Sequence, residues 1–315
     1  MWVLDRIRDF FSISPLINAW EAGQFSLAYL TSREGLQAVI MPVFPLLLAI
    51  EMLAILFMKR KAISEFYTSY KIPIVIYSFN KVVLLFFTFN SFLLCYTFFA
   101  PYALFNITYE WYYFLLAYIV WEFSHFIYHF TSHKVRILWC VHATHHAPTH
   151  MNLTVLFTDF FLQGVYATIL RVSICTLVGI PLPMLLFVMV IDGCWGSLIH
   201  ISENMLPNGK LGILGKIILT PSHHRVHHAK NSIYIDKNYC NLLNIWDRVF
   251  GTYKEEIKGV PPQYGVAREI NHQSFYDVYF GEFYCLLRDI KNAHSFKERL
   301  QLVVMPPGWK PKSER

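Results

Sequence analysis

Long apolar stretches alternate with short polar or basic breaks over the first two thirds of the chain. Apolar runs extend from Leu36 to Met58, from Ile72 to Phe99 and from Trp111 to Phe130. Each run reaches the roughly 20 apolar residues that an α-helix needs to cross a bilayer. The pattern therefore predicts three membrane-spanning helices in this part of the chain.

A fourth apolar stretch, from Val155 to Ile199, is interrupted by Gly179, Pro181 and Pro183. Prolines at this spacing break a helix, so the stretch predicts a helical hairpin that crosses the membrane and returns. The fold class that we expect is all-α, a polytopic membrane bundle of about five spans with a cytoplasmic histidine-rich cap.

Basic residues predict the orientation of these spans. Lys59, Arg60 and Lys61 follow the first apolar run, and Lys134 and Arg136 follow the third. Basic ends face the cytoplasm in membrane proteins. We expect an integral, multi-pass protein whose active site lies on the cytoplasmic face of a bacterial inner membrane or of the endoplasmic reticulum.

The same pattern predicts three regions along the chain. Residues 1–35 form an N-terminal interfacial segment, residues 36–205 form the transmembrane helices with the first histidine motifs, and residues 206–315 form a cytoplasmic cap with the last histidine motif and the C-terminal tail. Charge density rises from about Leu206 onward, where the long apolar runs end.

Composition supports a membrane protein and excludes other classes. The 315 residues are 55% hydrophobic and 15% charged, whereas soluble domains carry about 25% charged residues. The net charge of +6 indicates orientation and lipid-headgroup attraction, and we expect no nucleic-acid partner. The six cysteines are scattered without a CxxC pair, so neither a disulfide framework nor a thiolate metal site is predicted.

The histidines carry the candidate chemistry. Twelve of the fourteen lie between His125 and His228. They include an HxxxH pair and two HxxHH sets, and residues three and four apart share one face of a helix. The predicted topology brings all three motifs to one membrane face. The eight motif residues are His129, His133, His142, His145, His146, His224, His227 and His228.

Imidazole suits zinc, copper, iron and nickel, and eight imidazoles exceed what one tetrahedral zinc ion uses. The motifs therefore predict two metal ions. His150, His272 and His294 stand alone and are interpreted as surface or hydrogen-bonded residues.

Three stretches resemble the fatty acid hydroxylase/sterol desaturase superfamily of membrane di-iron enzymes. They are H-F-I-Y-H-F-T-S-H (125–133), L-W-C-V-H-A-T-H-H (138–146) and T-P-S-H-H-R-V-H-H (220–228). Residues 236–239 (D-K-N-Y) and 244–253 (N-I-W-D-R-V-F-G-T-Y) look like the alkylglycerol monooxygenase branch. The similarity covers roughly residues 70 to 255. Two departures are Phe130, where the family commonly has arginine, and Glu122, which aligns only loosely with the usual upstream acidic residue.

The resemblance implies a cofactor set and an activity. The eight motif histidines and His200 would hold two iron ions, with O2 as co-substrate, and one oxygen atom would enter a lipid C–H bond. An external electron donor would be a reduced pterin, a ferredoxin or a cytochrome b5 type. The lipid substrate, within the bilayer, and this donor are the expected partners.

Further residues are candidates by position for metal binding or for holding the ligands. They are His125, His223, Glu203, Asn152, Asp159, Asn238 and Asp247. Arg225 is a candidate for a lipid phosphate or for a role in the local fold, and no other substrate-binding residue is predicted.

Three alternatives stay open at this point. A sterol or fatty-acyl desaturase would use the same iron ligands, and ligand spacing does not separate the two reactions. A zinc-dependent membrane hydrolase would need a general-base carboxylate, and no HExxH motif is present. A metal carrier would place its ligands near the middle of the bilayer.

Overall fold

The computed structural model describes residues 43–59, 63–86 and 91–311, together with residues 12–24 and positions 5, 6, 8, 9, 26, 29, 34, 35 and 38. The chain divides into two compact units, Met1–Phe66 and Tyr67–Arg315. Every candidate site residue named above belongs to the second unit.

The first unit contains two described helices, α2 (Ser14–Glu21) and α5 (Val43–Lys59). Helix α2 lies in the segment predicted to be interfacial, most of whose other positions lie outside the described residues. Helix α5 occupies the first predicted span from Val43 onward, whereas positions 36, 37 and 39–42 of that span are not described.

The predicted all-α class is confirmed. Across the described ranges the regular elements are helices, with two isolated β-bridges, Ile218–Leu243 and Ala229–Tyr264. Helix α6 (Ile63–Phe86) begins in the last residues of the first unit and continues into the second. The other described helices of the second unit are α7 (Ser91–Phe99), η1 (Ala100–Tyr102), α8 (Tyr113–Lys134), α9 (Arg136–His146), η2 (Leu153–Phe157), α10 (Gln163–Val178), α11 (Leu182–Leu198), η3 (Gly212–Lys216), α12 (Pro221–His227), α13 (Ile245–Val249), α14 (Phe275–Asn292) and α15 (Phe296–Val304).

The predicted membrane spans are not confirmed by the structure. Within the part of the chain that the structure describes, we find no helix that combines the length and the apolarity required to cross a membrane. The number of spans, their orientation and the three predicted regions therefore stay predictions.

Two of the predicted boundaries need correction. The run from Ile72 to Phe99 was expected to form one helix, but it holds the end of α6 and all of α7, on either side of positions 87–90. The third run was expected to end at Phe130, but α8 continues to Lys134. Its last turn carries His133, so the helix brings both members of the HxxxH pair to the site.

The hairpin is confirmed as a helical structure. Helix α10 ends at Val178, and Gly179 follows it with a φ of +100°. Glycine adopts this left-handed conformation at little energetic cost because it has no Cβ atom. A Cβ atom there would lie 1.9 Å from the carbonyl oxygen of Phe105. Pro181 then caps the start of α11 in an extended conformation.

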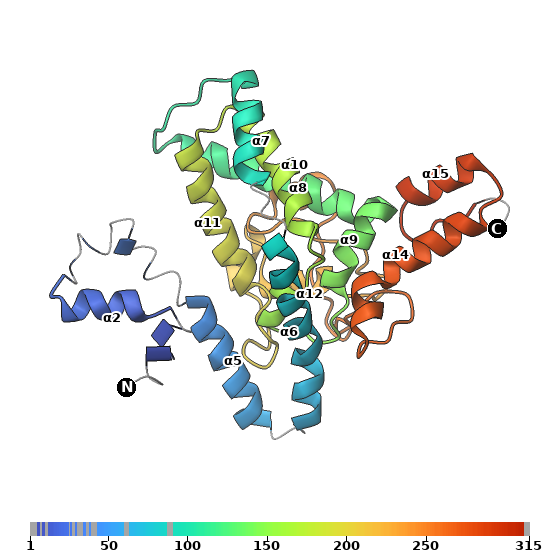
Figure 1. Cartoon of the computed structure of the whole chain (residues 1–315), viewed down its shortest axis with the longest axis horizontal. Coiled ribbons are helices and arrows are strands. Elements are labelled where there is room, and N and C mark those ends of the chain that lie inside the picture. Colours follow the sequence, from blue (N-terminus) through green and yellow to red (C-terminus); the bar gives the residue numbers. More distant parts are fainter. Residues whose placement is uncertain are drawn as a thin grey trace. The chain divides into compact units, whose positions relative to one another are not determined.

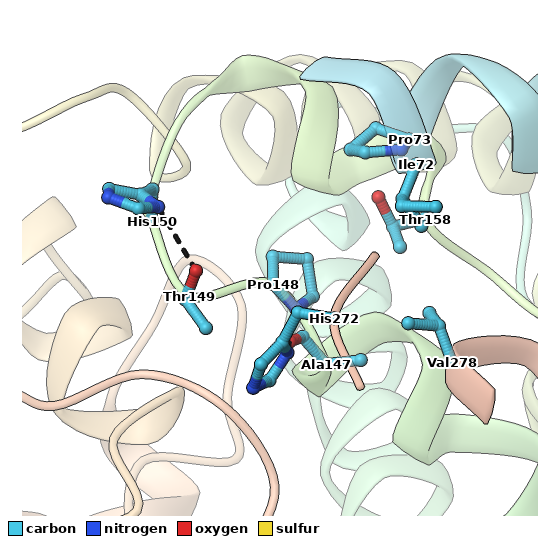
Figure 2. A pocket seen from close by; sticks show the side chains of 9 residues that line it. All are labelled: Ile72, Pro73, Ala147, Pro148, Thr149, His150, Thr158, His272 and Val278. Atoms are coloured by element: carbon cyan, nitrogen blue, oxygen red, sulfur yellow. Dashed lines mark hydrogen bonds between the residues drawn. The ribbon is translucent and has the colours of Figure 1, made fainter. Parts of the chain in front are cut away.

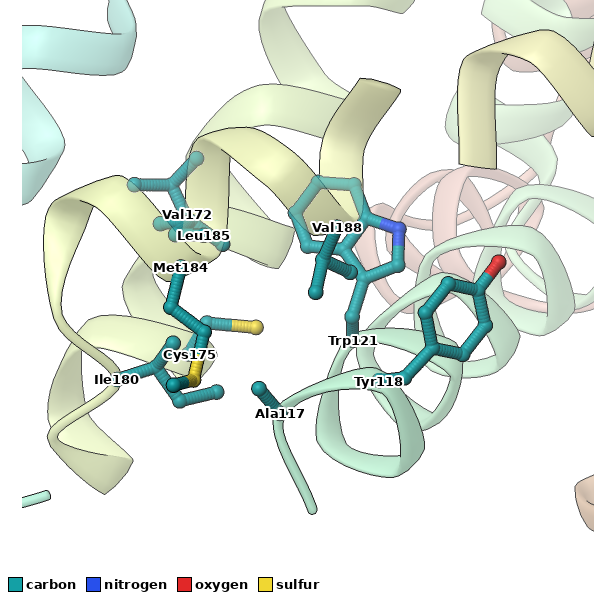
Figure 3. Packing of buried hydrophobic residues seen from close by; sticks show 9 residues of the cluster. All are labelled: Ala117, Tyr118, Trp121, Val172, Cys175, Ile180, Met184, Leu185 and Val188. Carbon is teal, nitrogen blue, oxygen red and sulfur yellow. The ribbon is translucent and has the colours of Figure 1, made fainter. Parts of the chain in front are cut away.

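Helices α8, α10 and α11 share an apolar core (Figure 3). Trp121 of α8, Val172 and Cys175 of α10, and Met184 and Val188 of α11 are almost fully buried there. A core of this size stabilises the frame that carries the site, since each fully buried aliphatic side chain contributes about 1.5–3 kcal/mol.

The C-terminal helices pack on the helix that carries the first HxxHH set. Helices α14 and α15 lie beside α9 (Figure 1). Leu286 of α14 and Leu302 of α15 bury their side chains with Cys140 of α9. Segments far apart in the sequence therefore enclose α9.

Candidate dimetal centre

Nine buried histidines form two clusters of possible metal ligands. His129, His133, His142, His146 and His227 form the first cluster, and His145, His200, His224 and His228 form the second. Within each cluster the ligand nitrogens lie within 4.8 Å of one another. These nine are the histidines that the sequence motifs and the position of His200 indicate as ligands. Metal binding by them stays a prediction.

Each HxxHH motif is divided between the two clusters. In α9, His142 and His146 face the first cluster and His145 faces the second. In the second motif, His224 and His228 face the second cluster and His227 faces the first. Residues four apart on a helix share a face, whereas adjacent residues point about 100° apart. Two imidazoles of each HxxHH set therefore face one cluster, and the third faces the other.

The clusters lie against each other. The ring of His146 in the first cluster stacks on that of His228 in the second with their centroids 4.3 Å apart, and the rings of His227 and His228 are 5.3 Å apart. The rings of His142 and His145 are 5.4 Å apart. Two ions held in these clusters would be neighbours, as a dimetal centre requires.

The Nε2 atoms of the first cluster point toward a common centre. His129 and His142 have these atoms 3.1 Å apart, and His142 and His146 have them 3.2 Å apart. Two nitrogens bound at right angles to one ion at about 2.1 Å would be about 3.0 Å apart. The observed spacing thus fits nitrogens gathered around one ion.

The second cluster shows the same spacing. The Nε2 of His200 lies 3.3 Å from that of His145 and 2.9 Å from that of His224, which in turn lies 3.0 Å from that of His228. His200, given by the sequence as one possible ligand, thus occupies the middle of this cluster.

Backbone carbonyls orient three of the rings. The Nδ1 of His129 bonds the oxygen of Tyr239 at 2.9 Å, the Nδ1 of His227 bonds that of Lys237 at 2.8 Å, and the Nδ1 of His200 bonds that of Gly196 at 2.6 Å. A carbonyl only accepts, so these Nδ1 atoms carry the proton and their Nε2 lone pairs face the clusters. Such bonds are typical of the surroundings of metal-binding histidines.

Burial keeps the rings neutral. It lowers the pKa values of His142, His146, His224 and His228 well below their ordinary value, and neighbouring imidazoles lower them further. Neutral rings that direct lone pairs at one another repel unless a cation lies between them. The buried Nε2 atoms of His133 and His227 also have no hydrogen-bond partner among the described residues. The donor set therefore fits bound metal ions.

A carboxylate and an amide connect the two clusters on the outside. Gln163 accepts a hydrogen bond from the Nδ1 of His142 at 3.2 Å, and its amide donates to the Oδ1 of Asp159 at 2.7 Å. The same oxygen lies 3.2 Å from the Nδ1 of His145, although the pair is not aligned as a hydrogen bond. Asp159 was predicted from its position, whereas Gln163 was missed; its spacing of four residues from Asp159 was the available signal.

The segment that supplies two of the orienting carbonyls is itself held by side chains. Asp247 accepts hydrogen bonds from the backbone N–H groups of Tyr239 and Cys240 and from the hydroxyl of Thr252. Asn238, in the left-handed region with φ of +57°, donates to the carbonyls of His223 and Lys254 and accepts the N–H of Lys254. Both act on the ligands through the backbone.

Glu122 ties α8 to the same segment. Its carboxylate accepts the N–H groups of Asn241, Leu242 and Leu243 and is fully buried. Asn241 in turn donates to Asp192 of α11, which pairs with Arg171 of α10. The histidine-bearing helix, the hairpin and the following segment are thereby joined by polar contacts.

Four other candidates have local partners instead. His223 shares a capping box with Thr220 and contacts the hydroxyl of Tyr253 at 2.9 Å. Asn152 caps η2 through Thr154, and Glu203 accepts the hydroxyl of Tyr264. His125 stacks edge-on with His129 at 5.5 Å and lies outside both clusters.

The contacts of Arg225 favour a role in the local fold over the binding of a lipid phosphate. Its guanidinium donates to the carbonyls of Ile201, Leu206 and Pro207, and only 1% of the residue is exposed. A lipid phosphate would have to displace these bonds, so the structure gives no support to Arg225 as a headgroup ligand.

His272 is one of the isolated histidines, and it holds the end of α9. Its Nδ1 bonds the carbonyl oxygen of Ala147 at 3.0 Å, immediately after His145 and His146. Figure 2 shows its ring beside Ala147 and Pro148, with Val278 of α14 nearby. The space among these residues is only about 30 Å³, which is the size for a water molecule and too small for a substrate.

A larger cavity opens onto the two histidine clusters. It has a volume of about 560 Å³ and is lined by His133, His146 and His227 of the first cluster and by His228 of the second. Its other walls include Trp139 of α9 and residues of α14. This volume falls within the range of small-molecule sites.

An all-helical frame brings two adjacent clusters of buried imidazoles together as a candidate site for metal ions. Residues 114–252 match the model of the fatty acid hydroxylase family, and the chain belongs to this family. All nine cluster histidines lie within the matched residues.

The chain is also similar to individual members of this family with named activities. Human alkylglycerol monooxygenase is 30% identical over 226 residues, which is 68% of this chain and 46% of that protein. The alkylglycerol monooxygenase of Xenopus tropicalis is 30% identical over 210 residues, 64% of this chain and 43% of that protein. The ornithine lipid hydroxylase of Rhizobium tropici is 27% identical over 156 residues, 50% of this chain and 46% of that protein. The chain thus spans less than half the length of these relatives. No solved structure matches it.

Proposed function

We propose that the chain is an O2-dependent lipid hydroxylase or monooxygenase that acts with two iron ions. The observation that carries the proposal is the division of nine buried imidazoles into two adjacent clusters. The family match and the named activities of the relatives support the same reaction class.

The chemistry of the ligands favours iron over zinc. Structural and catalytic zinc sites take about four ligands around a tetrahedral ion. The first cluster offers five imidazoles, and neither cluster contains a carboxylate. Two iron ions bound here would supply the electron storage and O2 activation that C–H oxidation requires.

The residues of the chain fix the geometry and the protonation of this site. Tyr239, Lys237 and Gly196 hold imidazole protons on the outside of the clusters through their carbonyl oxygens. The reaction would insert one oxygen atom into a lipid C–H bond and release the other as water, with two electrons and two protons taken from an external donor. A reduced pterin, a ferredoxin and a cytochrome b5 type protein are the candidate donors.

We place the protein in a membrane, with its active site at the cytoplasmic face. Support comes from the apolar runs of the sequence and from exposed apolar side chains on the helices that surround the apolar core. Exposed examples are Leu93, Leu94 and Phe98 of α7, Leu115 and Leu116 of α8, and Leu186, Phe187 and Val190 of α11. Lipid would cover such side chains and thereby remove apolar surface from water.

The test combines metal analysis with labelled oxygen. Protein purified anaerobically in detergent should contain about two iron ions per chain, and incubation with 18O2, a reductant and total lipid extract should give a labelled lipid alcohol. His145→Ala should abolish the labelled product and leave insertion unchanged, because it removes one ligand from the second cluster. Zinc in place of iron, with no oxygen uptake, would refute the proposal.

A desaturase remains the alternative reaction for the same ligands. Desaturation removes two hydrogens and adds no labelled oxygen to the lipid, so the mass of the product separates the two. The relatives named as a monooxygenase and a hydroxylase favour oxygen insertion.

A further inference from the structure

The cavity at the metal clusters carries more positive than negative charge. Its lining includes the cations Arg136, Lys230, Arg268, Arg288 and Lys310 and the carboxylates Asp236, Glu282 and Asp289. Residues of the family domain form one wall, and residues 265–310, which follow the family match, form the other. The C-terminal segment is thus part of the site.

Each lining carboxylate already has a cationic partner. Asp236 pairs with Lys134, Asp289 pairs with Arg136, and Glu282 lies 2.7 Å from Arg268. Arg268 also pairs with Asp277 at 2.7 Å. These pairs fix the walls and occupy the three carboxylates of the lining, so none of them is left to balance Lys230.

Lys230 and Arg288 are two cations that line the same cavity. Across the described ranges, no carboxylate lies within ion-pair distance of Lys230. The Nε of Arg288 is 3.6 Å from Asp289, whose nearer partner is Arg136. Both residues are exposed and belong to the cavity lining. An anion would complete this arrangement.

We propose that the cavity binds a phosphate or carboxylate group, carried by the head group of the lipid substrate, against the two metal clusters. This inference rests on the proposed lipid oxygenase function and names the substrate class as an anionic lipid. Since the volume is that of a small-molecule site, the cavity would hold the head group and the first few chain carbons. Because ligand imidazoles line the same cavity, the oxidised carbon lies close to the head group.

The test measures binding without turnover. Iron-loaded protein in an uncharged detergent, kept under argon, is titrated calorimetrically with dihexanoyl phosphatidic acid and with dihexanoylglycerol, which has the same chains and no phosphate. We expect the anionic lipid to bind about tenfold more tightly. In the double variant Lys230→Gln/Arg288→Gln this preference should fall below about threefold.

Lys258→Gln/Arg299→Gln is the matched control, because it removes the same two charges from exposed positions outside the cavity lining. It should keep the preference, and both double variants should keep the iron content of the unmodified protein. Equal binding of the two lipids by the unmodified protein, or a preference that survives in the cavity variant, would overturn the proposal.

Inorganic phosphate separates the two possible sources of the anion. If it competes only at much higher concentration than the lipid, the head group is supported as the ligand. Competition at equal concentration would assign the site to a free anion and overturn the head-group inference. Since no oxygen is present, these results stand apart from the labelled-oxygen test, which can fail or succeed independently.

Discussion

His129 donates its Nδ1–H to the carbonyl oxygen of Tyr239, a residue 110 positions further along the chain, over 2.9 Å. This bond connects a ligand on α8 to the segment that follows the second HxxHH motif. The position of the carbonyl depends in turn on Asp247, which holds the N–H groups of Tyr239 and Cys240. The geometry of a ligand is thus set by a side chain that does not touch it.

Asp247→Asn should weaken the first cluster without removing a ligand. The amide would place an N–H donor against one of the groups that now donate to Asp247, and the segment should shift. Loss of such a supporting contact typically lowers metal affinity about 10–100-fold, and stability should fall by about 1–3 kcal/mol. Iron retention against a chelator series measures the first effect. The exposed Glu269→Gln serves as the control, and unchanged iron retention in Asp247→Asn would contradict the role assigned to Asp247.

Substituting either of two adjacent histidines in the second HxxHH motif should remove a different one of the two metal ions. His227→Ala removes a ligand of the first cluster and His228→Ala removes one of the second. Each variant should retain about one ion of the usual two per chain, whereas the double variant should retain few. Mössbauer spectra of 57Fe-loaded variants would reveal which ion remains. Identical residual spectra in the two single variants would refute the division of the motif. His294→Ala, at an exposed position, should retain both ions.

Gln163→Ala should affect the first cluster through His142. The variant removes the acceptor of the Nδ1–H of His142 and also frees Asp159 from its amide partner. We expect metal affinity to drop about 10–100-fold, with the larger loss in the first cluster. Gln273→Ala changes the same residue type at an exposed position and should leave iron content unchanged. Competition against a calibrated chelator measures both variants.

Asn238 provides a separate test of backbone strain. Asn238→Ala loses three hydrogen bonds worth about 1 kcal/mol each and forces alanine into the left-handed region at a further cost of about 1–2 kcal/mol. Asn238→Gly loses the same bonds without that strain. The difference between the two free energies of unfolding, measured by denaturant titration, should therefore be about 1–2 kcal/mol in favour of glycine. A difference near zero would show that the φ value is not a constraint.

Gly281 allows the close approach of the guanidinium that forms one wall of the cavity. A Cβ atom at this position would lie 2.0 Å from Nη2 of Arg268 and 2.5 Å from Oδ1 of Asp277. Because Arg268 is held between Asp277 and Glu282, Gly281→Ala should destabilise the fold by about 1–3 kcal/mol. Gly193→Ala, a helical position with open space around it, should instead be neutral or stabilising by up to about 1 kcal/mol. Thermal unfolding of the two variants gives the comparison.

Spacing alone indicated eight of the nine histidines that the structure gathers, because i, i+3 and i+4 positions determine which faces of a helix carry them. The ninth, His200, was indicated only by the resemblance to the family. The sequence also predicted the break between α10 and α11, since Gly179 and Pro181 act through local backbone preferences. The all-α class followed from the length of the apolar runs.

Other features depend on contacts that spacing does not encode. The carbonyl partners of His129 and His227 belong to a segment without regular structure, so no periodicity points to them. His272 was interpreted as an isolated hydrogen-bonded residue, which is confirmed, but its partner at the end of α9 depends on how the C-terminal segment folds back. The cavity wall at residues 265–310 depends on the same packing.

Adjacent histidines at two short helices face different clusters, so the helical pitch, rather than a bridging side chain, would set the distance between two ions bound there. Inserting one residue between His142 and His145 would rotate the later imidazoles by about 100°, so that His145 would point where His146 now points and His146 would turn away from its present cluster. The register of these two short segments should therefore tolerate no insertion or deletion.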